Sequence, residues 1–162
     1  MFTAGVLTCS DSAFRGERED SAGPIIRAGL KEAGFDILIH KVVPDDIESI
    51  AAAFRKWADL LSLDLIISTG GTGLSPRDVA PEATKLVAER EVPGIAEALR
   101  HAGMQFTPRA MLSRARAVTR GSTLIINLPG SPKAVQQSLE VLLPVLPHAI
   151  SKIKGDSTPC AQ

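Results

Sequence analysis

The sequence predicts a protein of the α/β class, with a mostly parallel central sheet covered by helices on both faces. Strand-like and helix-like segments alternate along the chain, as parallel strands joined by crossover helices require. The strand-like segments are nearly continuous apolar runs, as in a sheet that is buried on both faces. The length of 162 residues suits one domain. We place this domain at residues 1–154, with a flexible C-terminal tail at 155–162.

Three strands and two helices are expected in the first half of the chain. The strands are short runs of β-branched and apolar residues at 6–9, 37–43 and 63–68. The helix at 22–33 stops before Gly34, a residue type typical of helix C-termini. The helix at 47–61 carries its apolar residues on one face, so Trp57 is expected in the core.

The second half begins with a glycine-rich loop at 69–76 and contains one clear strand. The other expected features are helices at 81–90 and 93–102, an arginine-bearing stretch at 109–120, a turn at 121–122, a strand at 123–128, and helices at 131–142 and 143–153. This order keeps the alternation that the fold class requires.

Composition and charge exclude several classes of function. The chain has 18 Lys and Arg and 18 Asp and Glu, so no net charge attracts it to nucleic acid or to an anionic membrane. Cys9 and Cys160 lie at opposite ends and indicate neither a disulfide framework nor a zinc site. The three histidines, His40, His101 and His148, show no catalytic or metal spacing. With no signal-like N-terminus and no apolar run of the ~20 residues that span a bilayer, we expect a cytoplasmic protein.

Polar or glycine-rich segments follow four of the predicted strands. They lie at 10–12, 44–46, 69–73 and 129–133, with Arg77 and Asp78 just beyond the third. Parallel strands bring their carboxyl ends to one edge of a sheet, and ligands bind there in open α/β folds. We therefore expect these segments to form one site.

The glycine-rich loop favours a phosphate ligand. It reads Thr69, Gly70, Gly71, Thr72, Gly73, so backbone N–H groups can approach an anion without obstruction by Cβ atoms. It matches neither a Walker A motif nor a dinucleotide fingerprint. The alternative is a plain tight connection.

Asp45 and Asp78 are candidates for handling Mg²⁺, which takes one or two carboxylates and fills its other positions with phosphate oxygens and water. The alternative for each is a helix N-cap: Asp45 precedes a helix and has Glu48 three residues on, and Asp78 lies shortly before Pro81.

Basic residues offer further anion contacts. Lys133, at the start of a helix, could pair with a phosphate or be a solvated lysine. Four arginines could bind an anionic substrate or lie on a solvated face: Arg109, Arg114, Arg116 and Arg120.

The segment from Thr69 to Thr84 resembles the signature of the molybdenum-cofactor biosynthesis proteins of the MogA/MoaB type, which the G domain of gephyrin shares. The likeness continues at 92–97, at 110–114 and at 126–133, and covers the chain from Ser10 to about Lys152. The resemblance implies a three-layer α/β/α sandwich, commonly assembled as a homotrimer.

The resemblance also implies the activity of a molybdopterin adenylyltransferase. In that reaction AMP passes from Mg²⁺-ATP to the terminal phosphate of molybdopterin, pyrophosphate leaves, and the product goes to a molybdenum insertase of the MoeA type. One alternative is a non-catalytic MoaB-like protein that binds molybdopterin or the nucleotide. Another is a nucleotide pyrophosphatase of the related competence-damage family.

Residue roles follow from the same resemblance. Asp45 and Asp78 would be catalytic and hold Mg²⁺. The nucleotide would contact Asp11, Thr69, Gly70, Gly71, Thr72, Gly73 and Glu82. The pterin substrate would contact Ser113, Pro129, Gly130, Ser131 and Lys133.

Overall fold

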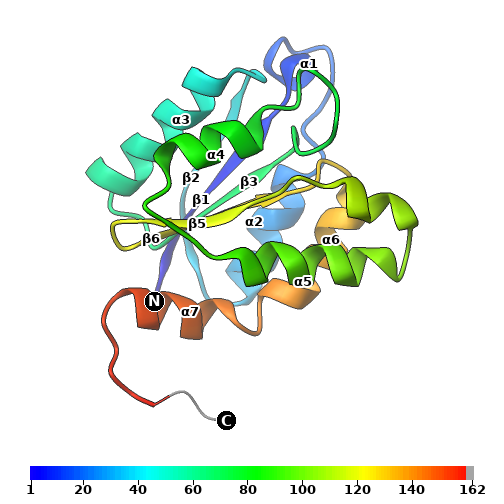
Figure 1. The fold of residues 1–162 in the computed structure, drawn as a ribbon. Coiled ribbons are helices and arrows are strands. Elements are labelled where there is room, and N and C mark those ends of the chain that lie inside the picture. Colours follow the sequence, from blue (N-terminus) through cyan, green and yellow to red (C-terminus); the bar gives the residue numbers. More distant parts are fainter. Residues whose placement is uncertain (160–162) are drawn as a thin grey trace.

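The computed structural model describes residues 1–159, which form one six-stranded sheet between two layers of helices (Figure 1). The strand order is β2-β1-β3-β6-β5-β4. The parallel strands are β1 (Thr3–Cys9), β2 (Asp36–Val43), β3 (Leu65–Thr69) and β6 (Thr123–Leu128). Two short antiparallel strands, β5 (Ala117–Arg120) and β4 (Arg90–Glu91), complete one edge. The predicted mostly parallel α/β/α architecture is confirmed.

Two apolar clusters fill the spaces between the sheet and its helices. One cluster lies beneath α2 (Gly23–Glu32), α5 (Pro93–Met104), α6 (Pro132–Leu142) and α7 (Leu146–Ile153). The other lies beneath α3 (Ile47–Arg55), its π-helical extension η1 (Lys56–Leu60) and α4 (Ala80–Val87). Trp57 is 1% exposed in the second cluster, which confirms its predicted core position.

Four short elements of the structure were not predicted from the sequence. The helix α1 (Asp11–Phe14) and the 3₁₀ helix η2 (Pro108–Leu112) have only 4 and 5 residues, too few for helical periodicity. The prediction also missed β5 and β4. The strand β5 lies within the arginine-bearing stretch. The helix that was predicted to reach residue 90 ends at Val87, and β4 begins at residue 90.

The remaining boundaries agree with the prediction to within a few residues. The last strand, β6, and the turn at 121–122 match, whereas β1 and β2 begin earlier than predicted, and α7 begins three residues later than predicted. At the predicted strand 63–68, Leu63 and Asp64 instead precede β3.

The parallel register brings the four strand ends to one edge, as predicted. Cys9 pairs with Val43, Thr8 with Thr69, and Thr69 with Leu128. The segments that follow these strands therefore start side by side.

The opposite end of the sheet is tied together by Asp64. This side chain is buried and accepts hydrogen bonds from the backbone N–H of Thr3 at 2.8 Å and from Lys154 Nζ at 2.6 Å. It thus joins the start of β1 to the residue that follows α7.

The C-terminal segment after α7 has no helix or strand up to Pro159, and Lys152 donates to the carbonyl of Asp156 at 3.0 Å. The rest of the predicted tail, with Cys160, lies outside the described residues. Within residues 1–159 we find no helix with the length and apolar character to span a membrane.

Candidate active site

The glycine-rich loop leaves β3 at the carboxyl edge, and close packing requires its glycines. Gly70 and Gly71 have φ values of 90° and 66°, in the left-handed region that suits glycine. A Cβ atom on Gly70 would lie 2.4 Å from the carbonyl oxygen of Cys9. The buried Thr69 donates its hydroxyl to the carbonyl of Pro129 at 2.7 Å. The loop is thereby fixed against the ends of β1 and β6, and the Thr69 hydroxyl is used inside the protein.

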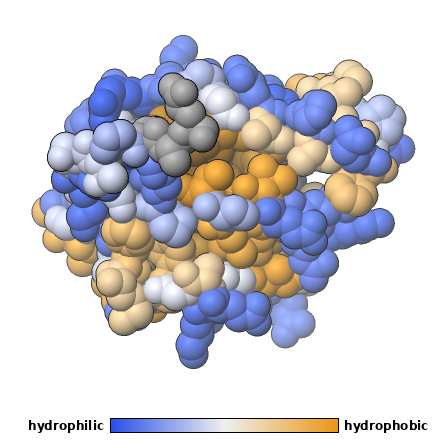
Figure 2. Space-filling view, turned by 90° about the horizontal axis from the view of Figure 1, so that it is seen from below, coloured by the Kyte–Doolittle hydropathy of each residue, from blue (hydrophilic) through white to orange (hydrophobic). Residues whose placement is uncertain are grey.

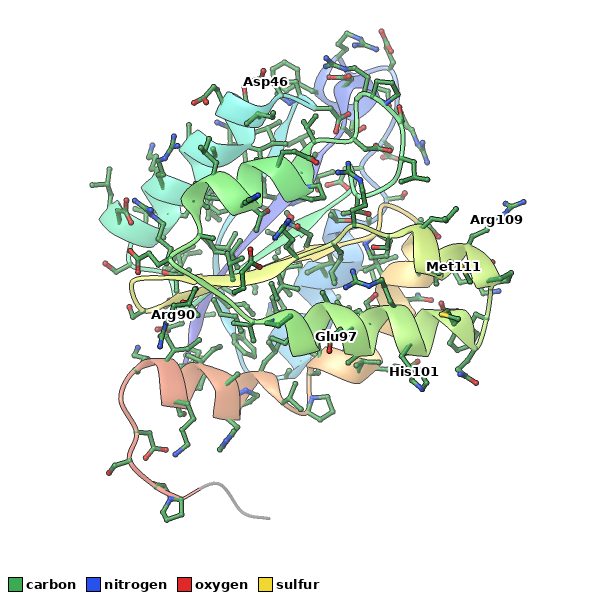
Figure 3. The ribbon with its side chains drawn as sticks, in the orientation of Figure 1. Asp46, Arg90, Glu97, His101, Arg109 and Met111 are labelled. Carbon is green, nitrogen blue, oxygen red and sulfur yellow. The ribbon has the colours of Figure 1, made fainter. Side chains whose placement is uncertain are left out.

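Neither candidate aspartate caps a helix. The N-cap of α3 is Asp46, which accepts the N–H of Ser49 at 2.8 Å (Figure 3). Asp78 accepts the N–H of Ser75 at 2.9 Å within the loop, and α4 begins without a side-chain cap. The helix-cap alternative is therefore wrong for both Asp45 and Asp78.

Asp45 and Asp11 bind each other's backbone. The N–H of Asp11 donates to Asp45 Oδ2 at 2.9 Å, and the N–H of Asp45 donates to Asp11 Oδ1 at 3.0 Å. The other oxygen of Asp45, Oδ1, is buried and has no hydrogen-bond partner. Burial raises the pKa of Asp45; the hydrogen bond from Asp11 opposes this, and the negative charges of Asp11 and Asp78 add to it. A buried carboxylate oxygen without a partner is costly, so Asp45 Oδ1 is suited to accept a further contact.

The free oxygen of Asp45 faces the glycine-rich loop. A Cβ atom on Gly71 would lie 3.2 Å from Asp45 Oδ1, and one on Gly73 would lie 2.9 Å from Asp78 Oδ2. The two carboxylates thus approach two glycines of one loop. Hard oxygen donors of this kind fit a cation such as Mg²⁺. Across residues 1–159 no cluster of three or more His, Cys, Asp or Glu side chains is arranged for a metal. Asp45 and Asp78 are the residues that could hold such a cation.

Arg77 supplies positive charge to this acidic edge. Its guanidinium donates to both carboxylate oxygens of Asp11, at 2.9 and 3.0 Å, although its side chain is 65% exposed. The backbone hydrogen bond from Asp45 and the contact with Arg77 together lower the pKa of Asp11. The loop is thereby linked across the edge to the segment after β1.

Glu82, on α4, forms an ion pair with Arg114. Burial raises the pKa of Glu82, but the hydrogen bond from Arg114 outweighs this, and the net pKa is lowered. Its carboxylate therefore faces a guanidinium beside the loop.

Two more of the four predicted arginines form ion pairs, as Arg114 does with Glu82. Arg116 pairs with Glu91 at 2.6 Å, and Arg120 pairs with Asp59 at 2.7 Å. Arg109 lies on η2 with its side chain pointing outward (Figure 3), and it contributes to the lining of a cavity. Arg116 and Arg120, whose side chains are 35% and 25% exposed, thus have acidic partners within the chain.

Two cavities flank the loop and divide the residues assigned to the pterin substrate. A mostly apolar cavity of about 270 Å³ lies between α5, η2 and α6 and includes Thr72, Gly73, Ser113 and Pro129. A more polar cavity of about 340 Å³ lies on the other side. Its lining includes Ser10, Thr69, Gly70, Gly130 and Ser131. Lys133, in the first turn of α6, lines neither of the two.

Asn127 is a site residue that the sequence analysis did not single out. It is fully buried at the end of β6, and its Nδ2 donates to Ser68 Oγ and Thr84 Oγ1, each at 2.8 Å. Its Oδ1 accepts the N–H of Arg116 at 3.1 Å. It also lines the apolar cavity. An amide within an otherwise apolar strand is the signal that could have identified it.

The fold and site define an α/β protein with a mostly parallel sheet, in which acidic side chains face a glycine-rich loop at the carboxyl edge of the parallel strands. The chain belongs to the family described as a probable molybdopterin binding domain, which matches residues 5–148.

Three relatives show how closely the chain follows this family. The molybdopterin biosynthesis enzyme MoaB of Thermus thermophilus is 52% identical, with a TM-score of 0.91 over 96% of this chain and 98% of that one. The molybdopterin adenylyltransferase of Helicobacter pylori strain J99 is 39% identical over 94% of this chain and 88% of its own length. Gephyrin of Dictyostelium discoideum is 45% identical over 93% of this chain, which spans only 22% of gephyrin.

Proposed function

We propose that the protein is a molybdopterin adenylyltransferase of molybdenum cofactor biosynthesis. It transfers AMP from ATP to the terminal phosphate of molybdopterin and releases pyrophosphate. The observation that carries this proposal is the buried, unpartnered Oδ1 of Asp45 beside the glycine-rich loop. The name of the Helicobacter relative, which this chain matches over 88% of its length, supports the same reaction.

The nucleotide half of the site would use the loop and the aspartates. The N–H groups of Gly71, Thr72 and Gly73 would bind phosphate oxygens, whereas the N–H of Gly70 donates to the carbonyl of Leu128 at 3.1 Å, so Gly70 would contact the nucleotide through its Cα. Asp45 and Asp78 would hold Mg²⁺. When bound, Mg²⁺ supplies charge neutralisation at the polyphosphate and aligns the α-phosphorus. Asp11 would line the nucleotide side, where it keeps Asp45 in place through their mutual backbone hydrogen bonds. Glu82 would act on this side through Arg114.

The pterin half would use the apolar cavity and the segment after β6. Ser113 and Pro129 line that cavity next to Thr72 and Gly73, so a ring system there would contact the nucleotide loop. Gly130, Ser131 and Lys133 would orient the terminal phosphate near the N-terminus of α6, where the helix dipole favours an anion.

No protein nucleophile is needed, because the phosphate of molybdopterin itself attacks the α-phosphorus. The chain's contribution is to bring two polyanions together and to hold the reacting atoms in line. Cys9 lies close to the site, but burial raises the pKa of its thiol, as does the charge of Asp45. It therefore stays protonated and serves as a packing residue.

We further propose a cytoplasmic homotrimer that delivers its product to a molybdenum insertase of the MoeA type. Apolar surface gathers on the face that carries α7 (Figure 2). A groove of about 340 Å³ there includes Ile95, Ala149 and Ile153. Exposed apolar patches of this kind mark protein contacts. Light scattering of the purified protein tests the assembly, and a mass of three chains is expected.

The reaction is tested by anaerobic incubation with molybdopterin, Mg²⁺ and ATP labelled at the α-phosphate. Label should move to the pterin with the wild-type protein, and transfer should collapse with Asp78→Asn. A sample without molybdopterin is the control. If molybdopterin binds and no label moves, the protein is a binding module; release of AMP without molybdopterin would identify a pyrophosphatase.

A further inference from the structure

Arg114 makes a set of contacts with the glycine-rich loop that an ion pair alone does not explain. Its backbone N–H donates to the carbonyl of Thr72 at 2.9 Å. Its guanidinium donates to the carbonyls of Gly73 at 2.8 Å and Asp78 at 2.6 Å, and it also pairs with Glu82. One residue thus binds the loop at the beginning and end of the segment 73–78.

We infer that Arg114 is a positioning residue, which holds the loop and Asp78 in the conformation that binds the nucleotide; this inference rests on the proposed function. The four residues 74–77 between its two side-chain contacts are exposed. Loops of this kind are mobile unless their ends are fixed. The planar fork of an arginine suits two carbonyl oxygens better than the single ammonium of a lysine.

The contacts also orient the backbone. A trans peptide group points its N–H opposite to its C=O. Since the carbonyls of Gly73 and Asp78 accept from the guanidinium of Arg114, the N–H groups of Leu74 and Val79 point away from its positive charge. Arg114 thus fixes the orientation of two peptide groups of the loop and leaves their N–H donors on the side opposite to its own charge.

A second arginine supports the segment that carries Arg114. Arg100, on α5, donates to the carbonyls of Ser113 at 3.2 Å and Ala115 at 3.1 Å. These residues flank Arg114 on either side. Ser113 lines the apolar cavity together with Thr72 and Gly73. The segment therefore lies between the cavity and the loop and is held from both directions.

The chain supplies a matched control in Arg116. The side chains of Arg114 and Glu82 are 35% and 44% exposed, and those of Arg116 and Glu91 have the same values. Each arginine therefore has one equally exposed ion pair with a glutamate. The guanidinium of Arg114 additionally binds the loop carbonyls, which makes Arg116→Gln the control for loss of an exposed ion pair.

The test measures binding of Mg²⁺-ATP by calorimetry in the wild-type protein, Arg114→Gln, Arg114→Lys and Arg116→Gln, with melting temperatures in parallel. Arg114→Gln should weaken binding by about tenfold or more, as expected for losing charge-assisted hydrogen bonds that preorganise a site. Arg116→Gln should stay within about twofold of wild type, as for a surface ion pair. Arg114→Lys should restore only part of the affinity, and it keeps the test open if Arg114→Gln does not fold.

A purely structural role would lower the melting temperature of the Arg114 variants and leave their ATP affinity equal to that of Arg116→Gln; this result would overturn the inference. Full recovery by lysine would overturn it as well, because a single ammonium would then suffice. Absence of ATP binding by the wild-type protein would instead overturn the proposed function, and the inference with it. In the transfer assay, Arg114→Gln should lower kcat/KM for ATP by a similar factor.

Discussion

Two adjacent acids, Asp45 and Asp46, show how much single residues can differ in role. Asp46 satisfies the first turn of α3, so Asp45 is free to turn toward the loop. Both residues follow a predicted strand and precede a predicted helix, and the cap alternative was predicted for Asp45. Which of the two aspartates caps α3 depends on the backbone torsion angles between β2 and α3, and these angles cannot be inferred from the residue types. The position of the glycine-rich loop was predictable because its glycine spacing is itself the structural signal.

Asp45→Asn should abolish activity without destabilising the protein. The change keeps the shape of the side chain and removes the charge that would hold the cation, so transfer should fall by about 100-fold or more. The folded state raises the pKa of Asp45, which means that the charged form is unfavourable there. The melting temperature at neutral pH should therefore equal or exceed that of wild type. A clear loss of stability would contradict this account of Asp45.

The raised pKa of Asp45 also predicts a pH dependence. A carboxyl group whose pKa is higher in the folded than in the unfolded protein stabilises the fold at pH values below its pKa in the unfolded chain. This stabilisation is lost as the pH rises through its pKa in the folded protein. The melting temperature of Asp45→Asn should thus increasingly exceed that of wild type as the pH rises through that range. Mg²⁺-ATP affinity should weaken as pH falls, because a proton competes for the carboxylate. Calorimetry and thermal melts between pH 4 and pH 8 check both trends, and a flat affinity profile would refute the second.

At the level of elements, the parallel strands and their connecting helices were predictable, and the antiparallel edge was not. β6 is a mostly apolar run that contains Asn127 and is followed by a proline and a glycine, and its predicted bounds match. β5 has only four residues and ends in Arg120, so its buried residues are too few to show a period. β4 depends on pairing with β5 rather than on its own sequence.

The loop after β3 should tolerate no side chain at Gly70. An alanine there would combine a positive φ of 90° with a Cβ atom 2.4 Å from the Cys9 carbonyl. We expect a loss of about 2 kcal/mol or more in unfolding free energy, from strain and overpacking. Gly121→Ala is the control, since Gly121 has a positive φ of 54° but open space around its Cβ position. Equal losses in urea unfolding would show that packing against Cys9 contributes nothing.

At the scale of the whole molecule, the site and the contacts that close the fold lie at opposite ends of the sheet. The rule that parallel strands place ligands at their carboxyl edge was sufficient to predict the gathering of four separate segments. The closing contacts were not predictable, because Asp64 meets Thr3 and Lys154 across 61 and 90 residues of sequence. Only the folded topology brings these residues together.

Asp64→Asn should destabilise the protein and leave its catalytic rate unchanged. Burial alone would raise the pKa of Asp64, but the hydrogen bonds from Lys154 and Thr3 outweigh it, and the net pKa is lowered. The stabilisation is therefore present at pH values above the pKa of Asp64 in the unfolded chain. It is lost as the pH falls through the pKa of Asp64 in the folded protein. We expect a loss of about 1–3 kcal/mol at neutral pH, as for a charge-assisted hydrogen bond.

Urea unfolding at pH 7 and pH 3 measures this effect. The difference in unfolding free energy between Asp64→Asn and wild type should be smaller at pH 3 than at pH 7. Asp36→Asn, which changes an exposed acid on β2, is the control and should be neutral at both. If the difference in unfolding free energy were the same at both pH values, the shape of the Asp64 side chain, rather than its charge, would stabilise the fold.

The most direct test of the central claim follows two labels of ATP in one anaerobic reaction with molybdopterin. ATP labelled at the α-phosphate should pass its label to the pterin, while ATP labelled at the γ-phosphate should release its label as pyrophosphate in equal amount. Both should require Asp45. Transfer of the γ label to the pterin, or release of α-labelled AMP with no pterin product, would contradict adenylyl transfer at the carboxyl edge of this sheet.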